Sequence, residues 1–442
     1  MVVYRKGGEG YEDARQAAIW NGYKPDRFPD VVAVVENADE VVDVVRLARS
    51  EGHRIGIRSG GHSWFANGIR DGGLLLDLSA LADFALDAEG QTASVAPAAR
   101  SEVFQQALVE RGFYFPVGTC ATTGIGGYLL GGGFSWMQRL LGIAAYSLRS
   151  LDFVTAEGER IHADDESHPD LLWAARGGGP RFPGVVTRFQ VDVQPLPGAM
   201  VSARYVFPIG ATAEFVDWYA QALATTPPEV SMFFMGMHSR LVDDYALTFV
   251  PLAFADDLPA AEELLAPFER SSLAPRTLLR HPPAPWTFEQ GFRLLDLIYP
   301  EGLRFHPDSL WLNPEQAGLG EALQGVLEQL PNRPSHVFGA PYGPREHANA
   351  AFSKCTTFEA EVYGVADNAT GDEVVRDWVA RSVQELLPYS LGSGKTNVAD
   401  LAGRPQNTLS DESAKRLAEI RSRWDPDGVF YSDLGAAKME ER

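Results

Sequence analysis

The chain has 442 residues, of which 45% are hydrophobic, so it is too long for one core of the usual size and two or three domains are expected. Acidic residues outnumber basic ones by 59 to 38, and the formal charge of −21 argues against nucleic acid or an anionic membrane as the main partner. The sequence contains neither the apolar core of a signal peptide nor a membrane-spanning apolar stretch, which predicts a cytoplasmic protein. Arginine dominates the basic residues, and this bias suggests a bacterial origin.

The first part of the chain mixes helices and strands without a regular βαβ repeat, which favours the α+β class. Asn37 can cap a helix whose apolar residues lie at 41–47 and which ends near Gly52. Strands are predicted at 54–58 and 73–78, and the loop between them contains His62. The next predicted elements are a helix at 101–111, a loop with a short helix at 120–133, a hairpin at 151–159 and a strand at 184–193.

The character of the sequence changes near residues 195–198, where the density of glycine falls. We therefore predict a first unit at 1–197, a second at 198–404 and a C-terminal segment at 405–442. In the second unit, strands are predicted at 230–235, 244–250, 310–312, 335–338 and 357–363, with helices between them. This order is typical of an antiparallel sheet backed by helices, and a helix at 411–424 follows it.

Three glycine-rich segments carry the chemical signal in the first unit. They are Arg58-Ser59-Gly60-Gly61-His62-Ser63-Trp64, Gly118-Thr119-Cys120 and Gly124-Ile125-Gly126-Gly127-Tyr128-Leu129-Leu130-Gly131-Gly132-Gly133. Glycines gather in this way where the backbone approaches a ligand closely, and their N–H groups can form an anion-binding nest for a pyrophosphate. A nicotinamide-binding fingerprint is the rival reading, but Leu129 stands where that motif needs glycine or alanine. The first segment contains the nucleophile His62, and the second contains the nucleophile Cys120.

These segments resemble those of the vanillyl-alcohol oxidase family of flavoproteins, and within it the branch of berberine bridge enzyme and glucooligosaccharide oxidase. The resemblance covers nearly the whole chain and is strongest at 27–195. It implies a PCMH-type FAD-binding domain at 1–197, an antiparallel substrate-binding domain at 198–404, and a C-terminal segment at 405–442 that returns to the FAD domain. It also implies FAD as the cofactor, with a small-molecule substrate and O₂ as partners.

In that branch a histidine bonds the flavin 8α-methyl group and a cysteine bonds flavin C6, and His62 and Cys120 occupy those positions. The alternatives are a histidine that only hydrogen-bonds the backbone and a cysteine that is a small buried hydrophobe. The resemblance and the glycine motifs indicate the following cofactor-binding residues: Arg58, Ser59, Gly60, Gly61, His62, Ser63, Gly118, Thr119, Cys120, Thr123, Gly124, Gly126, Gly127, Tyr128, Gly131, Gly132, Gly178, Val186 and Asp433. No metal site is indicated.

The chain departs from the family at positions that bear on catalysis. Asp433 would put a negative charge near the flavin where relatives commonly carry an amide. Lys395 and Val398 replace the two tyrosines of the family's Y-x-N-Y-x-D segment. The base that takes the substrate proton in those relatives therefore cannot be carried over to this chain.

A base must be sought among other residues. Alternation along the strand at 357–363 puts Glu359, Glu361 and Tyr363 on one face, where crowded carboxylates would raise one pKa toward neutrality. The alternative is a solvated outer face. Lys395 is the second candidate, because a desolvated lysine can be neutral, although an exposed lysine is the commoner case.

The resemblance assigns Trp64 and Asn397 to the substrate, with simple packing as the alternative for Trp64. A small β-branched residue at the position of Thr123 is typical of relatives that react with O₂. We therefore expect an oxidase that takes a hydride from a C–H bond next to O or N of an alcohol, amine or sugar, and releases H₂O₂. A dehydrogenase with another electron acceptor, and a flavin-binding protein with lapsed catalysis, are the alternatives.

Overall fold

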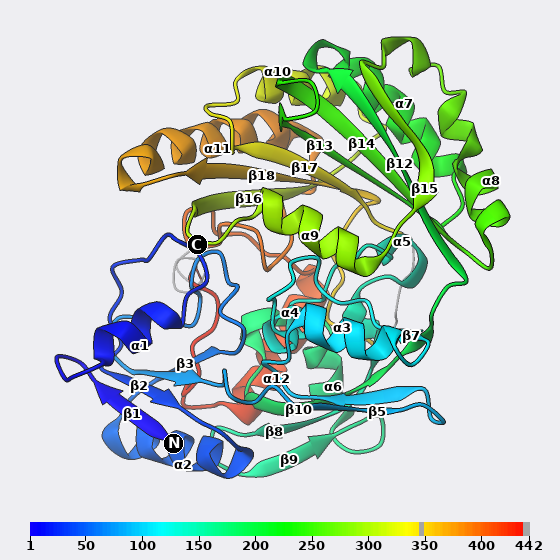
Figure 1. Cartoon of the computed structure of the whole chain (residues 1–442). Coiled ribbons are helices and arrows are strands. Elements are labelled where there is room, and N and C mark those ends of the chain that lie inside the picture. Colours follow the sequence, from blue (N-terminus) through cyan, green and yellow to red (C-terminus); the bar gives the residue numbers. More distant parts are fainter. Residues whose placement is uncertain (344–348, 436–442) are drawn as a thin grey trace.

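The computed structural model describes residues 1–343 and 349–435, and these form two halves, one above the other in Figure 1. The lower half contains a four-stranded and a five-stranded sheet, and the upper half contains a seven-stranded sheet. The mixture of helices and antiparallel sheets confirms the predicted α+β class. No helix in the described ranges is long and apolar enough to cross a membrane.

The four-stranded sheet has the order β1-β2-β4-β3, and β2, β4 and β3 run parallel. Its elements are β1 (Val2–Arg5), α1 (Tyr11–Ala17), β2 (Val31–Val34), α2 (Ala38–Glu51), β3 (Ile55–Arg58) and β4 (Leu74–Asp77). Asn37 caps α2 as expected, because its side chain accepts a hydrogen bond from the backbone N–H of Glu40. Gly52 ends the helix with φ +71°. The buried valines of α2 pack on this sheet.

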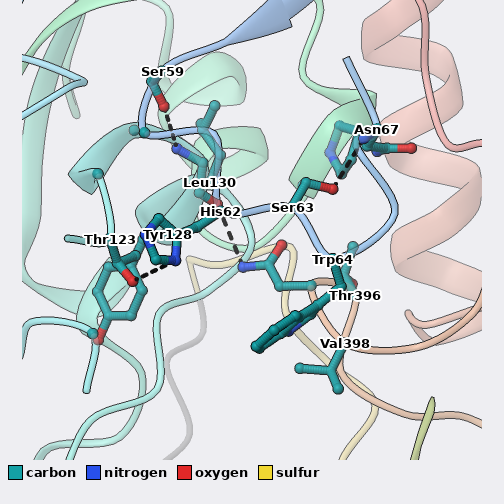
Figure 2. Close-up of a pocket in the computed structure, with 18 of the residues that line it drawn as sticks. Ser59, His62, Ser63, Trp64, Asn67, Thr123, Tyr128, Leu130, Thr396 and Val398 are labelled. Carbon is teal, nitrogen blue, oxygen red and sulfur yellow. Dashed lines mark hydrogen bonds between the residues drawn. The ribbon is translucent and has the colours of Figure 1, made fainter. Parts of the chain in front are cut away.

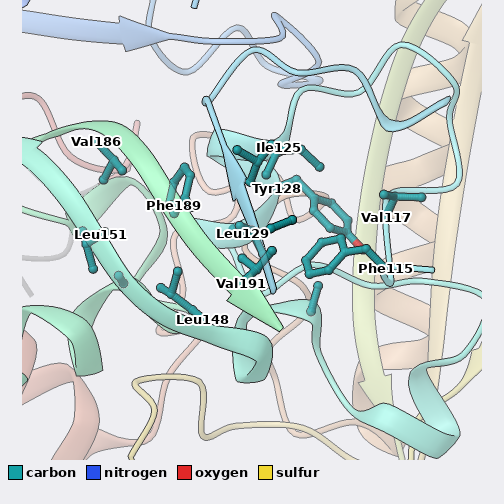
Figure 3. Packing of buried hydrophobic residues seen from close by; sticks show 14 of the residues in the cluster. Phe115, Val117, Ile125, Tyr128, Leu129, Leu148, Leu151, Val186, Phe189 and Val191 are labelled. Atoms are coloured by element: carbon teal, nitrogen blue, oxygen red, sulfur yellow. The ribbon is translucent and has the colours of Figure 1, made fainter. Parts of the chain in front are cut away.

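The five-stranded sheet has the order β5-β6-β10-β8-β9. Its strands are β5 (Phe84–Asp87), β6 (Thr92–Val95), β8 (Leu148–Val154), β9 (Arg160–Ala163) and β10 (Val185–Asp192), and a separate pair joins β7 (Phe113–Tyr114) to β11 (Gln194–Pro195). The helices of this region are α3 (Ser101–Val109), α4 (Ile125–Leu130), α5 (Gln138–Leu141) and α6 (Pro169–Ala175). Figure 3 shows Phe189 of β10 packed toward Ile125 and Tyr128 of α4, so this core fixes the glycine-rich segment from below.

The seven-stranded sheet is antiparallel throughout, with the order β15-β12-β14-β13-β17-β18-β16. Its strands are β12 (Ala199–Pro208), β13 (Val230–Ser239), β14 (Asp244–Ala255), β15 (Leu279–Pro285), β16 (Arg304–Leu312), β17 (His336–Pro341) and β18 (Phe358–Ala366). Helices α7 (Thr212–Thr225), α8 (Leu258–Glu269), α10 (Leu319–Glu328) and α11 (Asp372–Leu386) cover its outer face, while α9 (Phe288–Ile298) lies between the halves. Short 3₁₀ helices occur at Ala144–Ser147, Gly179–Arg181, Ile209–Ala211, Ala274–Arg276, Ala369–Gly371 and Leu387–Tyr389.

The C-terminal segment joins the lower half. After α12 (Asp411–Trp424), Phe430 forms a parallel bridge with Ile55 of β3. The backbone N–H of Ile55 donates to Val429 at 2.7 Å, and that of Tyr431 donates to Ile55 at 2.9 Å. Phe430 is fully buried in the core of the four-stranded sheet. The segment therefore extends the sheet beside β3, while the domain boundaries drawn from the sequence stay predictions.

Candidate active site

A cavity of about 360 Å³ lies between the two halves. Its lower wall consists of the glycine-rich loops, and its upper wall comes from α9, β17, β18 and the loop at 395–399. Figure 2 shows the loop of Ser59, His62 and Ser63 on one side, with Thr396 and Val398 on the other. Residues that are far apart in the sequence therefore share one enclosed space.

The glycine-rich loops touch each other through their backbones. A Cβ atom on Gly60 would lie 2.3 Å from the backbone nitrogen of Gly124, so a side chain at Gly60 would displace that loop. Gly127 differs, because a Cβ atom there would meet no atom within 4 Å although the residue lines the cavity. Packing therefore does not require glycine at position 127. Its bare backbone leaves open space of the kind that a ligand lying along the loop would occupy.

His62 projects from the loop toward Thr123 (Figure 2), and its ring also contacts Thr122. Its Nε2 atom lies 2.8 Å from Oγ1 of Thr122, and its Nδ1 atom lies 3.5 Å from Oγ1 of Thr123. The ring stacks on Trp20 with 4.6 Å between centroids. Burial, followed by neighbouring arginines, lowers the pKa of His62 to about 3. The imidazole is therefore neutral near pH 7, and its unprotonated nitrogen can act as a nucleophile.

Cys120 lines the cavity and packs against the aromatic cluster that contains Tyr299 and Tyr363. Burial raises the pKa of the Cys120 thiol to about 12, and the negative charges of Asp296 and Glu361 act in the same direction. The thiol is therefore protonated at neutral pH. Cys120 and Cys355 form no disulfide with each other.

A buried lysine connects the two glutamates of β18. Nζ of Lys395 lies 2.6 Å from Oε1 of Glu359 and 2.7 Å from Oε1 of Glu361. The second carboxylate oxygen of Glu361 accepts a hydrogen bond from the hydroxyl of Tyr363. Nζ also lies 4.3 Å from the ring centroid of Phe134, within range of a cation–π contact. Every potential donor of Lys395 therefore has a neighbour that attracts positive charge.

The two glutamates differ in their protonation because their surroundings differ. Burial raises the pKa of Glu359 well above its usual value, and the charge of Glu361 adds to the effect against the pull of Lys395. Burial alone would raise the pKa of Glu361 too, but Lys395 and hydrogen bonds with Glu359 and Tyr363 hold it below normal. Glu361 is therefore ionised at neutral pH, whereas burial disfavours the charged form of Glu359 on the other side of the Lys395 ammonium group.

Aromatic rings from both halves line the cavity beside this cluster. Trp64 lies edge-on to Tyr363, with 5.4 Å between centroids, and Tyr299 lies 5.2 Å from Tyr363. Behind them His336 stacks on Tyr363 at 4.7 Å, and its Nε2 atom lies 3.2 Å from the hydroxyl of Tyr299. His336 is fully buried, and burial lowers its pKa to about 4. The wall therefore presents an apolar aromatic surface with a few convergent oxygen atoms.

Most residues that the sequence indicated line this cavity. Those that do are Arg58, Ser59, Gly60, Gly61, His62, Ser63, Trp64, Gly118, Thr119, Cys120, Thr123, Gly124, Gly126, Gly127, Tyr128, Val186, Glu361, Tyr363, Lys395 and Asn397. The solvated outer face considered for β18 is wrong, because Glu359 is 1% and Glu361 4% exposed. The exposed position considered for Lys395 is wrong as well, since the residue is 7% exposed.

Five of the indicated residues are not in the cavity wall, namely Gly131, Gly132, Gly178, Glu359 and Asp433. Gly131 leaves room for the side chain of Asn397, since a Cβ atom would lie 2.2 Å from its Nδ2 atom. Glu359 lies behind Lys395. Asp433 forms an ion pair with Arg181 at 3.1 Å, which neutralises the charge that the sequence suggested near the flavin.

Sequence reasoning missed several residues of the wall, among them Phe134, Gln138, Tyr299 and Phe338. Phe233 and Phe338 lie on neighbouring strands and stack with 5.8 Å between centroids. For the methionines at 232–237 and the phenylalanines between them, the sequence favours the core, with a hydrophobic substrate pocket as the alternative; Met232 lies in the core and Phe233 in the cavity wall. Only the order of strands β13 and β17 in the sheet places Phe233 and Phe338 together.

Comparison with known proteins agrees with this arrangement. A model of the FAD binding domain matches residues 29–164. FAD-linked oxidoreductase nodO of Hypoxylon pulicicidum is 28% identical over 96% of this chain and 95% of its own length. An uncharacterized FAD-linked oxidoreductase of Bacillus subtilis, YvdP, is 33% identical over 47% of this chain and 46% of its own.

Solved structures share the fold over almost the whole chain. 6-Hydroxy-D-nicotine oxidase from Arthrobacter nicotinovorans has a TM-score of 0.85 at 22% identity, covering 98% of this chain and 97% of its own. A BBE-like protein of Physcomitrella patens has a TM-score of 0.85 at 20% identity, covering 98% and 96%. The grass pollen allergen Phl p 4 has a TM-score of 0.84 at 18% identity, also covering 98% and 96%.

The fold, the FAD-binding domain and the relatives together define an FAD-dependent oxidoreductase. The chain contains an FAD binding domain, resembles FAD-linked oxidoreductases over almost its whole length, and shares its fold with a BBE-like protein and with 6-hydroxy-D-nicotine oxidase. Relatives occur in both fungi and bacteria.

Proposed function

We propose that the protein is an oxidase that removes a hydride from a C–H bond next to O or N of a small, largely apolar substrate, with O₂ as the final acceptor. The observation that carries the proposal is the cavity itself. One wall holds His62 and Cys120, and the other holds the ionised Glu361 with Tyr363. Bound FAD would supply the two-electron acceptor between these walls, and transfer of the electrons to O₂ would give H₂O₂.

The glycine loops around Gly60 and Gly127 would hold the cofactor, and we propose covalent bonds through His62 and Cys120. The neutral state of His62 supports attachment there, because an unprotonated imidazole nitrogen is nucleophilic. The protonated thiol of Cys120 must lose its proton first. We therefore expect the bond to His62 to form without Cys120, while the second bond depends on a nearby proton acceptor.

Glu361 is our candidate for the group that receives the substrate proton. Its carboxylate is ionised and lines the cavity, and the hydroxyl of Tyr363 is hydrogen-bonded to it. A substrate O–H or N–H can thus give its proton to the oxygen of Tyr363 while Tyr363 passes its own to Glu361. Lys395 offsets the charge of Glu361 and fixes its orientation.

Thr123 supports O₂ as the acceptor, since this small residue lines the cavity beside His62. Wild-type Phl p 4 is a glucose dehydrogenase, and an isoleucine-to-valine variant of Phl p 4 is a glucose oxidase. Side-chain size can therefore separate the two activities within this architecture. A threonine is close to a valine in size.

Purified wild type, His62→Ala and Cys120→Ala proteins should be compared by visible absorbance, acid precipitation and intact mass. We expect wild type to keep its yellow colour in the acid pellet and Cys120→Ala to keep one covalent bond through His62. A colourless protein without a mass adduct, after expression with added FAD, would contradict the attachment.

A panel of aromatic alcohols, amines and sugars should then be screened for O₂ uptake and H₂O₂ release. Wild type should release one H₂O₂ for each substrate oxidised, whereas Thr123→Leu should lose peroxide formation and still reduce an artificial dye. Dye reduction by wild type without peroxide would identify a dehydrogenase. A cofactor that no compound bleaches would identify a flavin-binding protein with lapsed catalysis.

A further inference from the structure

His336 has a hydrogen-bonding pattern that fixes which of its nitrogens carries the proton. Its Nδ1 atom lies 2.9 Å from the carbonyl oxygen of Pro334, and a carbonyl oxygen can only accept. Nδ1 must therefore be the protonated nitrogen. Because burial lowers the pKa of His336 to about 4, the ring is neutral and Nε2 carries no proton. Nε2 can then only accept a hydrogen bond.

This assignment determines the orientation of the Tyr299 hydroxyl. The hydroxyl oxygen lies 3.2 Å from Nε2 of His336, so Tyr299 must donate its single proton to that nitrogen. Tyr299 also lines the cavity. Its oxygen therefore has lone pairs, and no proton, to offer to any other partner.

Tyr363 is committed in the same way on the neighbouring strand. Its hydroxyl donates to the ionised carboxylate of Glu361, which is a stronger acceptor than a phenol oxygen. Lys395, the nearest cation, lies between Glu359, Glu361 and the ring of Phe134. Along this stretch the oxygen atoms of Tyr299 and Tyr363 therefore face the cavity as hydrogen-bond acceptors.

We propose that His336, acting through Tyr299, makes this wall a hydrogen-bond acceptor and so selects substrates that carry a hydroxyl or amine N–H donor on an aromatic or apolar frame. His336 is a positioning residue, since it lies behind Tyr299 and outside the cavity lining. The inference names the substrate class of the proposed oxidase and so rests on that function. A ligand that has only acceptor groups could form no hydrogen bond with Tyr299 or Tyr363, because both tyrosine protons are already donated to other groups. Such a ligand should therefore bind more weakly.

Binding of phenol and anisole to the FAD-loaded protein tests this proposal without turnover. Phenol carries the donor, and anisole replaces it with a methyl ether. Both titrations should be followed anaerobically by the visible spectrum of FAD and by tryptophan fluorescence, because Trp64 lies in the wall. Wild type should bind phenol at least tenfold more tightly than anisole.

Two variants at position 336 separate a positioning role from a structural one. His336→Phe keeps a ring against Tyr363 but removes the acceptor, so the Tyr299 hydroxyl can turn toward the cavity and donate to anisole. The phenol preference should then fall at least threefold. His336→Gln places an amide oxygen within reach of Tyr299 and should restore the wild-type preference. An equal preference in wild type and His336→Phe would overturn the proposal, as would binding of neither probe.

The tautomer can be read directly by ¹⁵N NMR of protein labelled at its 9 histidines, with His336 assigned by its loss in His336→Gln. We expect a neutral ring protonated at Nδ1, and protonation at Nε2 would contradict the inference. These measurements need no peroxide. If the protein discriminates between phenol and anisole but forms no H₂O₂, the role of His336 is supported and the oxidase activity is contradicted. If it forms H₂O₂ but does not discriminate between the probes, the oxidase activity is supported and the role of His336 is contradicted.

Discussion

Glu359 and Glu361 differ by two positions in one strand, yet the structure gives them different tasks. Both are buried on the same face of β18 and both contact Lys395. Only Glu361 reaches the cavity and receives the hydroxyl of Tyr363. Glu359 lies behind the lysine, where burial raises its pKa. The pair therefore offers a matched comparison between a cavity carboxylate and a buried one.

Glu361→Gln should slow anaerobic reduction of the bound FAD by substrate by about 100-fold or more, as expected when a general base is removed. Glu359→Gln changes a carboxyl group outside the cavity wall to an amide of the same shape and should change the rate less than about fivefold. Stopped-flow absorbance of both variants, with thermal unfolding as a control for folding, measures the contrast. Equal losses of rate would show that the two carboxyl groups act as one unit.

At the residue scale, His62, Cys120 and most of the glycine loops that the sequence indicated line the cavity, because each signal lies within a few neighbouring residues. Glu361, Tyr363 and Lys395 were also indicated, through strand alternation and a replaced motif. Tyr299 and His336 could not be found in this way. Their contact depends on the end of α9 meeting β17, and neither segment carries a local pattern that announces it.

At the scale of elements, the buried side chain of Asn21 forms hydrogen bonds with both halves of the molecule. The side-chain amide of Asn21 donates to the carbonyl oxygens of Trp64 and Phe305, each at 2.8 Å. Its Oδ1 atom accepts from the backbone N–H groups of Phe305 and Tyr23, each at 3.0 Å. Trp64 belongs to the loop after β3 and Phe305 to β16, so Asn21 fixes the loop of His62 against the upper sheet.

Asn21→Ala should lower the free energy of unfolding by about 3 kcal/mol, because it leaves several buried backbone groups without partners. Chemical denaturation measures this loss. Asn313→Ala provides the control, since Asn313 is exposed and its side chain accepts a single hydrogen bond within the described part of the chain, from the N–H of Glu315, and it should cost less than about 1 kcal/mol. A loss below about 1 kcal/mol at Asn21 would contradict the role assigned to this side chain.

Strand assignment shows the same division between local and distant information. The helix capped by Asn37 and the helix at 411–424 were predicted because their caps and periodicity are local. Strand β15 was missed, since it contains Pro282 and Pro283 and prolines argue against a strand. The prolines are tolerated because β15 lies at the edge of the seven-stranded sheet, where one side of the strand forms no hydrogen bonds with a neighbouring strand.

At the scale of the whole molecule, folding buries neutral histidines and so makes stability depend on pH. The pKa of His336 falls from 6.5 to about 4 and that of His62 from 6.5 to about 3 when the chain folds. The unfolded chain therefore binds more protons than the folded one between these values. The stabilisation is complete above about pH 6.5 and is lost as the pH falls through the folded pKa values.

For His336 alone, this linkage amounts to about 2 kcal/mol between about pH 8 and about pH 5. Between these pH values, denaturant unfolding of His336→Gln should show a loss about 2 kcal/mol smaller than that of wild type, because position 336 no longer titrates. The comparison of slopes is unaffected by any constant cost of the substitution. Identical slopes would mean that His336 does not stay neutral in the folded protein.

The place of Phe430 in the first sheet has a consequence for how the protein is made. The ribosome delivers β3 long before Phe430, the neighbour that extends its sheet. Tyr431, Ser432 and Leu434, which follow Phe430, line the cavity together with the much earlier glycine loops. We therefore expect the cavity to be complete only after these residues have been synthesised, so that cofactor insertion follows their synthesis.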